Sequence, residues 1–499
     1  MAKPRSGHFW PHFHSWRQLS GERAHLALKS ELSLNLYQSM ATRKEYIWDS
    51  SAGAGYACSS HSGAIFNVEY SADGRTLVAA TENRKVLIFN ANTHELCKEI
   101  PAAHKSCVNL VKFLDSRTFV TCSDDCTLAV WDLRNCGQKV KSLKGHRNWV
   151  KSIEYDSSQG VLLSAAYDQT VLKWDINSSS SCPQNVLQIK NMLRMVLSPD
   201  STKMIISTAD GYLLIIHDLD LNHLAEDLRD FVPDLYRIMQ EDCSYGIDMG
   251  SWVNPLFTSH RNRVELISDF PEMDKNGYIT TLDVHPFGWA VLSRNTAANE
   301  LSEWTCVHDI MASDKPLELK PIKRPQNCNG LRPKSSAQSS TLSDSRDNSS
   351  DLSQLSDSSV IVISNQIGST QPHTTLVRQS KRCSQSNQND AIYVYKNSPR
   401  LKYYIEELNE SQGFIKELCF SGDGRVVCSP YQFGYRLLSF DSKCSEMSDC
   451  VSNEPKVLYE LKRSLCHPDS VVTTKFSPTH CQIASGCLKG RVVFSQPIL

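Results

Sequence analysis

The chain has 499 residues, more than one hydrophobic core ordinarily organises unless the fold grows by adding repeated units. Lysine and arginine total 53 against 54 for aspartate and glutamate, and this balance excludes a general electrostatic affinity for nucleic acid or anionic membranes. The first residues contain no apolar stretch typical of a secretory signal, and no run of about 18 apolar residues occurs. We therefore expect an intracellular protein, nuclear or cytoplasmic, whose 18 cysteines are reduced.

The first 45 residues have the composition of a docking segment. Residues 8–16 carry four large aromatic side chains, the last of them Trp16, and so short a stretch is either a disordered tail or a docking peptide. The next stretch has apolar residues every four positions, which predicts an amphipathic helix; alternating leucines leave a strand as the weaker option. The apolar line of this helix includes Leu28, Leu32 and Leu36. Such a helix either packs on the domain that follows or binds a partner.

Repeats begin with three histidines spaced by 43 and 42 residues: His61, His104 and His146. Each is followed 27 or 28 residues later by an aromatic residue, namely Phe89, Trp131 and Trp174. Between these markers come an apolar strand, a turn, and two strands around an Asp-containing hairpin. Four weaker copies follow, which makes seven copies of three countable strands, with the fourth strand of each lying between copies.

The seven copies resemble the WD40 repeat, and the resemblance covers most of residues 46–497. It implies an all-β fold, a seven-bladed propeller in which four-stranded sheets bury their faces by stacking in a ring. Ring closure requires one blade made from both chain ends. Residues 45–48, with the sequence Glu-Tyr-Ile-Trp, are the predicted closing strand.

The same resemblance implies a buried hydrogen-bond tetrad in copies two and three. The expected tetrads are His104, Thr121, Asp125 and Trp131 in copy two, and His146, Ser164, Asp168 and Trp174 in copy three. Buried groups of these four kinds can satisfy one another and make a blade rigid. A Ser-His-Asp hydrolase is the alternative, but the arrangement repeats, the hydroxyl lies in mid-strand, and no nucleophile elbow accompanies it.

Two insertions interrupt the repeats. The first, about 219–262, has helical spacing broken by Pro233, and we expect an extended blade connection packed against the ring. The second, about 312–390, is rich in serine and poor in aromatic residues, which predicts a disordered, phosphorylated loop. The predicted organisation is a docking segment 1–45, a first propeller part 46–311, the insertion 312–390, and the last blades 391–499.

Within the second insertion lies a β-branched run, Val360–Ile363, preceded by an aspartate and two serines. Such a run can add as a strand to the sheet edge of a partner, and it resembles a motif that binds the small ubiquitin-like modifier. A strand that pairs with the propeller is the alternative.

Signatures of catalysis are missing from the sequence: it has no phosphate-binding loop, no H-E-x-x-H and no G-x-S-x-G. Cys122 and Cys126 flank a hairpin, but no second pair is placed to complete a zinc site. We therefore expect a protein that is not an enzyme, without cofactor, metal or small-molecule substrate.

Arg134 is the most informative single residue, because an arginine two positions after Trp131-Asp132 is not needed for a blade; copy three has Asn177 there. Residues 119–134 resemble the box carried by WD40 substrate receptors of the cullin 4 ubiquitin ligases, although W-D-x-R also occurs in unrelated WD40 proteins. In that family the box docks on the damaged-DNA-binding-protein adaptor of the ligase. A planar guanidinium there can form two hydrogen bonds to a carboxylate of the adaptor.

The resemblance implies a non-catalytic receptor that bridges the ligase adaptor and an unknown target protein for ubiquitination. The expected adaptor-binding residues are Trp131, Asp132, Arg134, Trp16, Leu28, Leu32 and Leu36. Residues 285–289 and the interrupted ring narrow the resemblance to one member of this family. The alternative is a WD40 scaffold of another intracellular complex, unconnected to ubiquitin, in which Arg134 is dispensable. A propeller that faces histones or nucleic acid is weaker, given the balanced charge.

Overall fold

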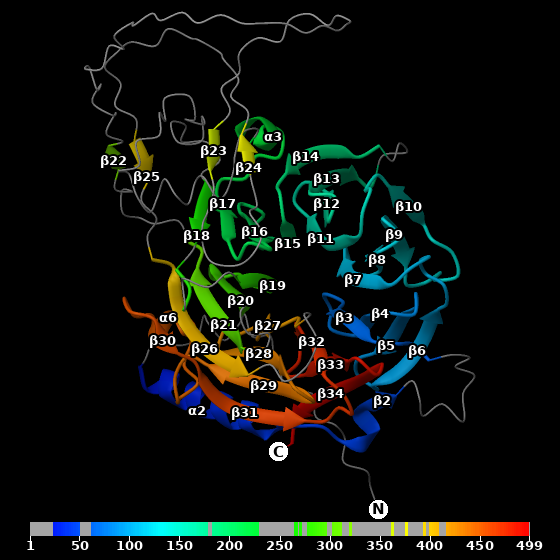
Figure 1. Ribbon diagram of the computed structural model, residues 1–499. Helices are drawn as coiled ribbons and strands as arrows, with labels where there is room; N and C mark the ends of the chain where they lie inside the picture. Colours follow the sequence, from blue (N-terminus) through cyan, green and yellow to red (C-terminus); the bar gives the residue numbers. More distant parts are fainter. Residues whose placement is uncertain are drawn as a thin grey trace, which may run out of the picture.

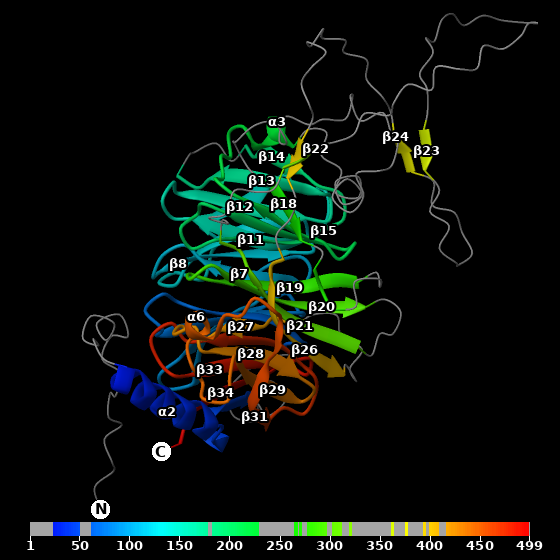
Figure 2. The same ribbon diagram turned by 90° about the vertical axis from the view of Figure 1, so that its left-hand side faces the viewer.

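The computed structural model describes residues 23–49, 61–177, 182–228, 264–267, 269–271, 277–296, 302–311, 319–321, 361–363, 375–377, 393–395, 399–408 and 416–498. These residues form a ring of seven antiparallel sheets around a central axis, seen face on in Figure 1 and from the side in Figure 2. The seven-bladed β-propeller predicted from the repeats is confirmed.

Four consecutive strands form each of the first four blades. Blade 1 contains β3 (Ile65–Tyr70), β4 (Thr76–Thr81), β5 (Val86–Asn90) and β6 (Glu95–Ile100). Blade 2 contains β7 (Val108–Phe113), β8 (Thr118–Ser123), β9 (Thr127–Asp132) and β10 (Lys141–Lys144). Blade 3 contains β11 (Val150–Asp156), β12 (Val161–Ala166), β13 (Thr170–Asp175) and β14 (Gln184–Gln188). Blade 4 contains β15 (Met192–Leu197), β16 (Met204–Thr208), β17 (Leu213–Ile216) and β18 (Val264–Ile267).

The remaining blades are built from less regular stretches of chain. Blade 5 contains β19 (Gly277–His285), β20 (Trp289–Thr296), β21 (Ser302–Asp309) and β26 (Leu401–Leu408), with β30 (Lys456–Val457) added beside β26. Blade 6 contains β27 (Cys419–Phe420), β28 (Val426–Tyr431), β29 (Gly434–Ser439) and β31 (Tyr459–Leu465). Blade 7 contains β32 (Val471–Phe476), β33 (Ile483–Cys487) and β34 (Arg491–Pro497). Both insertions therefore connect the third and fourth strands of a blade, the first in blade 4 and the second in blade 5.

The amino-terminal chain completes blade 7. Strand β2 (Ile47–Asp49) pairs with β34, so that Trp48 lies opposite Val492. Strand β1 (Met40–Ala41) pairs with the other end of β34. Between them, η2 (Lys44–Tyr46) is a single 3₁₀ turn. The ring is thus closed from both chain ends, as the sequence predicts.

Middle strands of the blades are buried on both faces, because each sheet lies between two neighbouring sheets. All six residues of β12 are buried, and five of them are accordingly apolar; the exception is Ser164, one of the expected tetrad residues. Leu162 and Trp174 pack there with Val120 and Leu128 of blade 2. Each such large apolar side chain stabilises the fold by about 1.5–3 kcal/mol, so the ring is held together mainly between blades.

Helix α2 (Arg23–Ser39) lies against blades 6 and 7, on the same side of the ring as α6 (Met447–Cys450) (Figure 2). The Tyr37 hydroxyl donates a hydrogen bond to Asp423 Oδ1 at 2.8 Å, and its ring meets Phe476 edge-on at 6.2 Å. Burial and the Asp423 carboxylate raise the pKa of Tyr37 well above its usual value. Met40, directly after the helix, is fully buried. The predicted helix is present, and it is packed on the propeller.

The described parts of the two insertions differ in their surroundings. Leu221, Leu224 and Leu228 are buried in a cluster with blades 3 and 4, around the short helix α3 (Leu224–Asp227). In the second insertion, β22 (Leu319–Pro321) pairs with β25 (Tyr393–Tyr395), and β23 (Ile361–Ile363) pairs with β24 (Thr375–Val377). The β-branched run thus pairs within the insertion, so the alternative of a strand added to the propeller is wrong. Binding of the small ubiquitin-like modifier stays a prediction.

The inner strands surround a central cavity of about 300 Å³. Charged side chains line it in pairs: Lys112 lies 2.9 Å from Glu154, Lys475 lies 3.1 Å from Glu69, and Arg194 contacts Glu417. Because these charges compensate one another, the cavity carries no large excess of either sign.

Two kinds of feature are absent from the described part of the chain. It contains no group of three or more His, Cys, Asp or Glu residues arranged to hold a metal ion. None of the helices described is both long and apolar enough to cross a bilayer.

Candidate functional site

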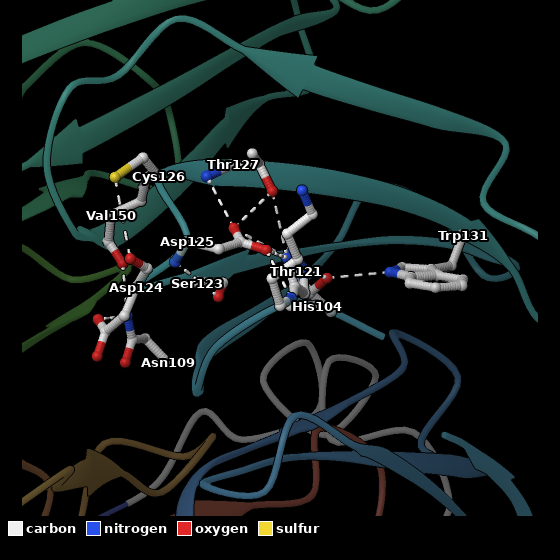
Figure 3. A network of polar contacts seen from close by, with 11 residues as sticks. His104, Asn109, Thr121, Ser123, Asp124, Asp125, Cys126, Thr127, Trp131 and Val150 are labelled. Carbon is white, nitrogen blue, oxygen red and sulfur yellow. Dashed lines mark hydrogen bonds and ion pairs between the residues drawn. The ribbon is translucent and has the colours of Figure 1, made fainter. Parts of the chain in front are cut away.

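In blade 2 a continuous hydrogen-bond chain links four side chains (Figure 3). The Trp131 indole donates to Thr121 Oγ1 at 3.0 Å, Thr121 Oγ1 lies 2.8 Å from His104 Nε2, and His104 Nδ1 lies 3.1 Å from Asp125 Oδ2. A carboxylate can only accept, so Nδ1 carries the proton and Nε2 accepts from the threonine hydroxyl. Each buried polar group is therefore satisfied.

Blade 3 repeats the arrangement. The Trp174 indole donates to Ser164 Oγ at 2.8 Å, Ser164 Oγ lies 2.7 Å from His146 Nε2, and His146 Nδ1 lies 3.0 Å from Asp168 Oδ2. Ser164 and Thr121 are fully buried, and their oxygens are occupied by the indole and the imidazole. A hydroxyl in this position braces a blade and cannot reach a substrate, which argues against the hydrolase alternative.

The ionisation of Asp125 makes the stability that the blade 2 tetrad contributes depend on pH. Burial opposes its ionisation, but hydrogen bonds from His104, from Thr127 and from the Lys105 N–H outweigh burial and lower its pKa. A carboxyl whose pKa is lower in the folded than in the unfolded chain stabilises the fold at any pH above its unfolded-state pKa. This stabilisation is lost as the pH falls from the unfolded-state pKa through the folded-state pKa.

We expect Asp125→Asn to lower the free energy of unfolding by roughly 1–3 kcal/mol at neutral pH, because it weakens a buried hydrogen-bonded charge. The difference from wild type should shrink below about pH 4, where the unfolded carboxyl is protonated. Urea unfolding across this pH range is the measurement, with Asp449→Asn, at an exposed aspartate of α6, as the control. A pH-independent difference would show that the Asp125 charge plays no part.

Blade 7 holds half a tetrad that sequence reasoning missed. His467 Nε2 lies 2.8 Å from Ser485 Oγ, and burial lowers the pKa of His467 to about 3. The two residues are 18 positions apart, the same separation as His146 and Ser164. That spacing is the signal that could have identified this pair.

Directly after the blade 2 tetrad, a tight turn fixes the backbone of Arg134. Asp132 Oδ1 accepts the Arg134 N–H at 2.9 Å, and the Asp132 carbonyl accepts the Asn135 N–H at 3.0 Å. The Leu133 N–H donates to the Arg117 carbonyl at 2.9 Å. Arg134 itself is exposed, and within the described residues its guanidinium forms no ion pair. The turn therefore presents a free guanidinium on a rigid backbone.

Of the three predicted residues in this stretch, only Arg134 projects freely. Trp131 is 2% exposed, and the Lys139 ammonium lies over its ring at 5.7 Å. The Asp132 carboxylate is engaged with the Arg134 backbone. Asp175 forms the same turn with the Asn177 N–H in blade 3, where no arginine follows. The turn is thus a feature of the repeat, and Arg134 is what blade 2 adds to it.

Helix α2 presents part of its predicted apolar line to solvent. Leu32 is 51% exposed and Leu36 is half-buried, whereas Ser33 and Tyr37 face the propeller. Leu28 lies in the helix, but its side chain is outside the described residues, and so is Trp16. The structure leaves about half of the Leu32 side chain open to solvent.

Arg134 and α2 lie on the same face of the ring. In blade 2, β9 runs parallel to β7, because both are antiparallel to β8. The turn after β9, which holds Arg134, therefore lies on the face where the first strand of each blade ends. Asp423, which binds Tyr37 of α2, occupies the turn after the first strand of blade 6. Arg134 and the exposed side of α2 therefore share one face of the ring.

Comparison with known proteins gives two results. Residues 95–132 and 137–175 match the family described as WD domain, G-beta repeat; these stretches include most of blades 2 and 3, which carry the complete tetrads. Over most of its length the chain is similar to proteins named DDB1- and CUL4-associated factor 10.

The protein of that name from Xenopus tropicalis is 37% identical over 468 residues, which cover 87% of this chain and 85% of the relative. The Danio rerio protein is 38% identical over 457 residues, covering 87% and 74%. The Homo sapiens protein is 35% identical over 463 residues, covering 87% and 70%. The predicted membership of the cullin 4-associated factors is confirmed. The chain belongs to the DDB1- and CUL4-associated factor 10 family.

Proposed function

We propose that this chain is the substrate-recognition subunit of a cullin 4 ubiquitin ligase and bridges the adaptor DDB1 and a target protein. The names of its relatives state an association with DDB1 and CUL4. The observation that carries the proposal is a shared face, which we call the adaptor face. On this side of the ring lie the Arg134 guanidinium, which has no ion pair within the described residues and stands on a rigid turn, and the exposed Leu32 of the docked helix α2.

Each element of this face suits a different part of a protein interface. The Arg134 guanidinium can donate two parallel hydrogen bonds to an adaptor carboxylate, which fixes orientation as well as adding energy. Leu32 offers an apolar contact that a groove of the adaptor can bury. Because α2 is held to blade 6 through Tyr37, the two contacts keep a fixed separation, so binding loses little conformational freedom.

In this role the chain supplies no general acid or base. It raises the effective concentration of target lysines near the charged ubiquitin-carrying enzyme, which is catalysis by proximity. The tetrads contribute by making the blades rigid, so that a target bound on one face is held at a defined distance from the ligase on the other.

Leu32→Glu is expected to weaken capture of purified DDB1 by about tenfold or more without lowering the melting temperature. The substitution places a charge where the adaptor would bury an apolar side chain, and about half of the Leu32 side chain is exposed in the isolated propeller. Leu488→Glu, on an exposed hairpin of blade 7, is the matched control. Equal capture by the Leu32 variant would remove this position from the interface.

The alternative is a WD40 scaffold in another intracellular complex. Affinity purification of the tagged full-length chain from cells, followed by quantification of DDB1 and cullin 4, separates the two functions. Recovery of both proteins with the wild-type chain supports the receptor function. Recovery of a stable complex that lacks both would favour the scaffold.

A further inference from the structure

The face opposite the adaptor face is formed by the turns that enter each blade and by the hairpins between second and third strands. In blades 2 to 4, a backbone hydrogen bond ties each turn to the hairpin beside it. In blade 2 the Asp124 N–H donates to the Cys107 carbonyl at 3.2 Å. The corresponding bonds run from the Tyr167 N–H to the Trp149 carbonyl at 3.0 Å in blade 3, and from the Ala209 N–H to the Asn191 carbonyl at 2.7 Å in blade 4. These turns are therefore rigid, and their side chains form a preformed surface.

Two large aromatic side chains are exposed at the blade 3 position of this surface. Trp149 is 48% exposed and Tyr167 is 40% exposed, and their ring centroids are 6.1 Å apart. Exposed Trp and Tyr side chains are the residues most often found at the energetic centre of protein interfaces. We call this pair the aromatic platform.

A half-buried network holds the platform in place. The Lys151 ammonium lies over both rings, at 5.1 Å from the Trp149 centroid and 5.7 Å from the Tyr167 centroid. It donates to Asp124 Oδ1 at 2.8 Å and to the side-chain oxygen Oδ1 of Asn109 at 3.2 Å. Asn109 in turn donates to Asp124 at 2.7 Å, and Figure 3 shows these two side chains together beside the blade 2 tetrad. Residues of blade 2 therefore hold the platform in place. The Lys151 ammonium already occupies the position over the two rings where a cation of a ligand could bind.

Cations flank the platform. The turns that enter blades 2, 3 and 4 each carry one exposed cation, which together form a cationic arc: Lys105, Arg147 and Lys190. None of the three forms an ion pair within the described residues.

The carboxylates on the same turns and hairpins are engaged. Asp124 is paired with Lys151, Asp125 and Asp168 belong to the tetrads, and exposed Asp210 accepts two hydrogen bonds from the Asn191 amide. The exposed charged side chains of these turns and hairpins are therefore three cations and one carboxylate, Asp210, which gives this part of the face an excess of exposed positive charge although the whole chain is balanced.

We propose that the aromatic platform and the cationic arc bind an acidic peptide segment of a target protein. An aromatic or large aliphatic side chain of the peptide packs on Trp149 and Tyr167, and carboxylate or phosphate groups beside it pair with Lys105, Arg147 and Lys190. Because Lys151 already covers the rings, a cationic ligand would meet repulsion there. This inference rests on the proposed receptor function, which it deepens by naming the chemistry of the target.

The test uses the purified full-length chain and a phage-displayed library of random linear peptides. Selection on wild type, with counter-selection on the double variant Trp149→Ser/Tyr167→Ser, should enrich peptides in which Asp or Glu flanks an aromatic or leucine residue. Synthetic copies of these peptides should bind the double variant about tenfold more weakly than wild type. Matching peptides with phosphoserine in place of Asp or Glu then show which anion is preferred.

A second variant tests the charges independently. Lys105→Glu/Arg147→Glu/Lys190→Glu should weaken peptide binding by about tenfold or more, and added salt should weaken wild-type binding. The controls are Phe433→Ser on the same face and Lys144→Glu on the outer strand of blade 2. Melting temperatures verify folding of every variant.

Three outcomes would overturn the inference: peptides that bind both variants as well as wild type, enrichment of basic peptides, or no peptide enriched over the counter-selected variant. DDB1 capture is measured in parallel on the same variants. DDB1 capture that persists in a variant that no longer binds the peptide would show that DDB1 and the peptide bind different faces of the ring. Failure of wild-type capture would count against the proposed function alone.

Discussion

Replacing Arg134 by glutamate is expected to abolish capture of DDB1 while the propeller remains folded. The guanidinium is exposed and makes no ion pair within the described residues, so its replacement removes nothing from the fold. The turn should persist, because it is formed by the Arg134 N–H and the Asp132 carboxylate, which the substitution leaves in place. Loss of a hydrogen-bonded charge pair at an interface costs roughly 2–5 kcal/mol, and a repelling charge adds to this.

The measurement is the affinity of purified DDB1 for immobilised wild type and variants, with melting temperatures recorded alongside. Arg147→Glu is the matched control, because it reverses another exposed arginine, on the opposite face. Arg134→Lys should fall between wild type and Arg134→Glu, since a lysine keeps the charge but cannot form the two-pronged contact. Undiminished capture by Arg134→Glu would show that this residue is only a surface arginine.

Removal of residues 1–45 is expected to destabilise the propeller, and not only to remove a docking segment. The deletion takes away Met40 and Tyr37, both buried, together with the Tyr37–Asp423 hydrogen bond and the pairing of β1 with β34. Two buried side chains at about 1.5–3 kcal/mol each and one net hydrogen bond at about 1 kcal/mol give a loss of roughly 5 kcal/mol. Urea unfolding of the two chains is the measurement.

Deletion of residues 1–22 is the matched control, because it leaves α2 and both closing strands in place. We expect this shorter deletion to unfold at the same urea concentration as wild type. Loss of DDB1 capture by the longer deletion therefore does not by itself locate the interface. Equal stability of the two deletions would show that blade 7 closes without β1 and α2.

The ring and its tetrads could be predicted because their signals are local and repeated. His146, Ser164 and Asp168 lie within one repeat, and a period near 43 residues fixes their relation. The closing strand at Trp48 follows from the requirement that a ring has no open edge. Pattern and topology were sufficient for these features.

Contacts between distant parts of the chain could not be predicted in this way. The spacing of α2 points to Leu28, Leu32 and Leu36, but the residue buried against the ring is Tyr37, whose partner Asp423 is 386 positions away. Tertiary contacts, rather than the helix period alone, decided which side of α2 is buried.

Glu407 is a second example. It lies fully buried on the outer strand of blade 5, where it contacts Arg436 and accepts hydrogen bonds from Thr305 and Ser429, each at 3.2 Å. All four of these residues lie outside the copies that match the repeat closely, so no spacing indicates the network. The aromatic platform was missed for the same reason: Trp149 and Tyr167 are unconstrained by the repeat, and only the folded turns bring them together.

Amide hydrogen exchange of the full-length chain, with and without purified DDB1, tests the central claim most directly. We predict that DDB1 slows exchange in the turn after β9, at residues 133–136, and in the exposed turns of α2, while the turns that carry Lys105, Arg147 and Lys190 exchange as before. Protection of both predicted segments would locate the adaptor on the face that Arg134 and Leu32 share. Protection of the opposite face, or no protection at saturating DDB1, would contradict the account.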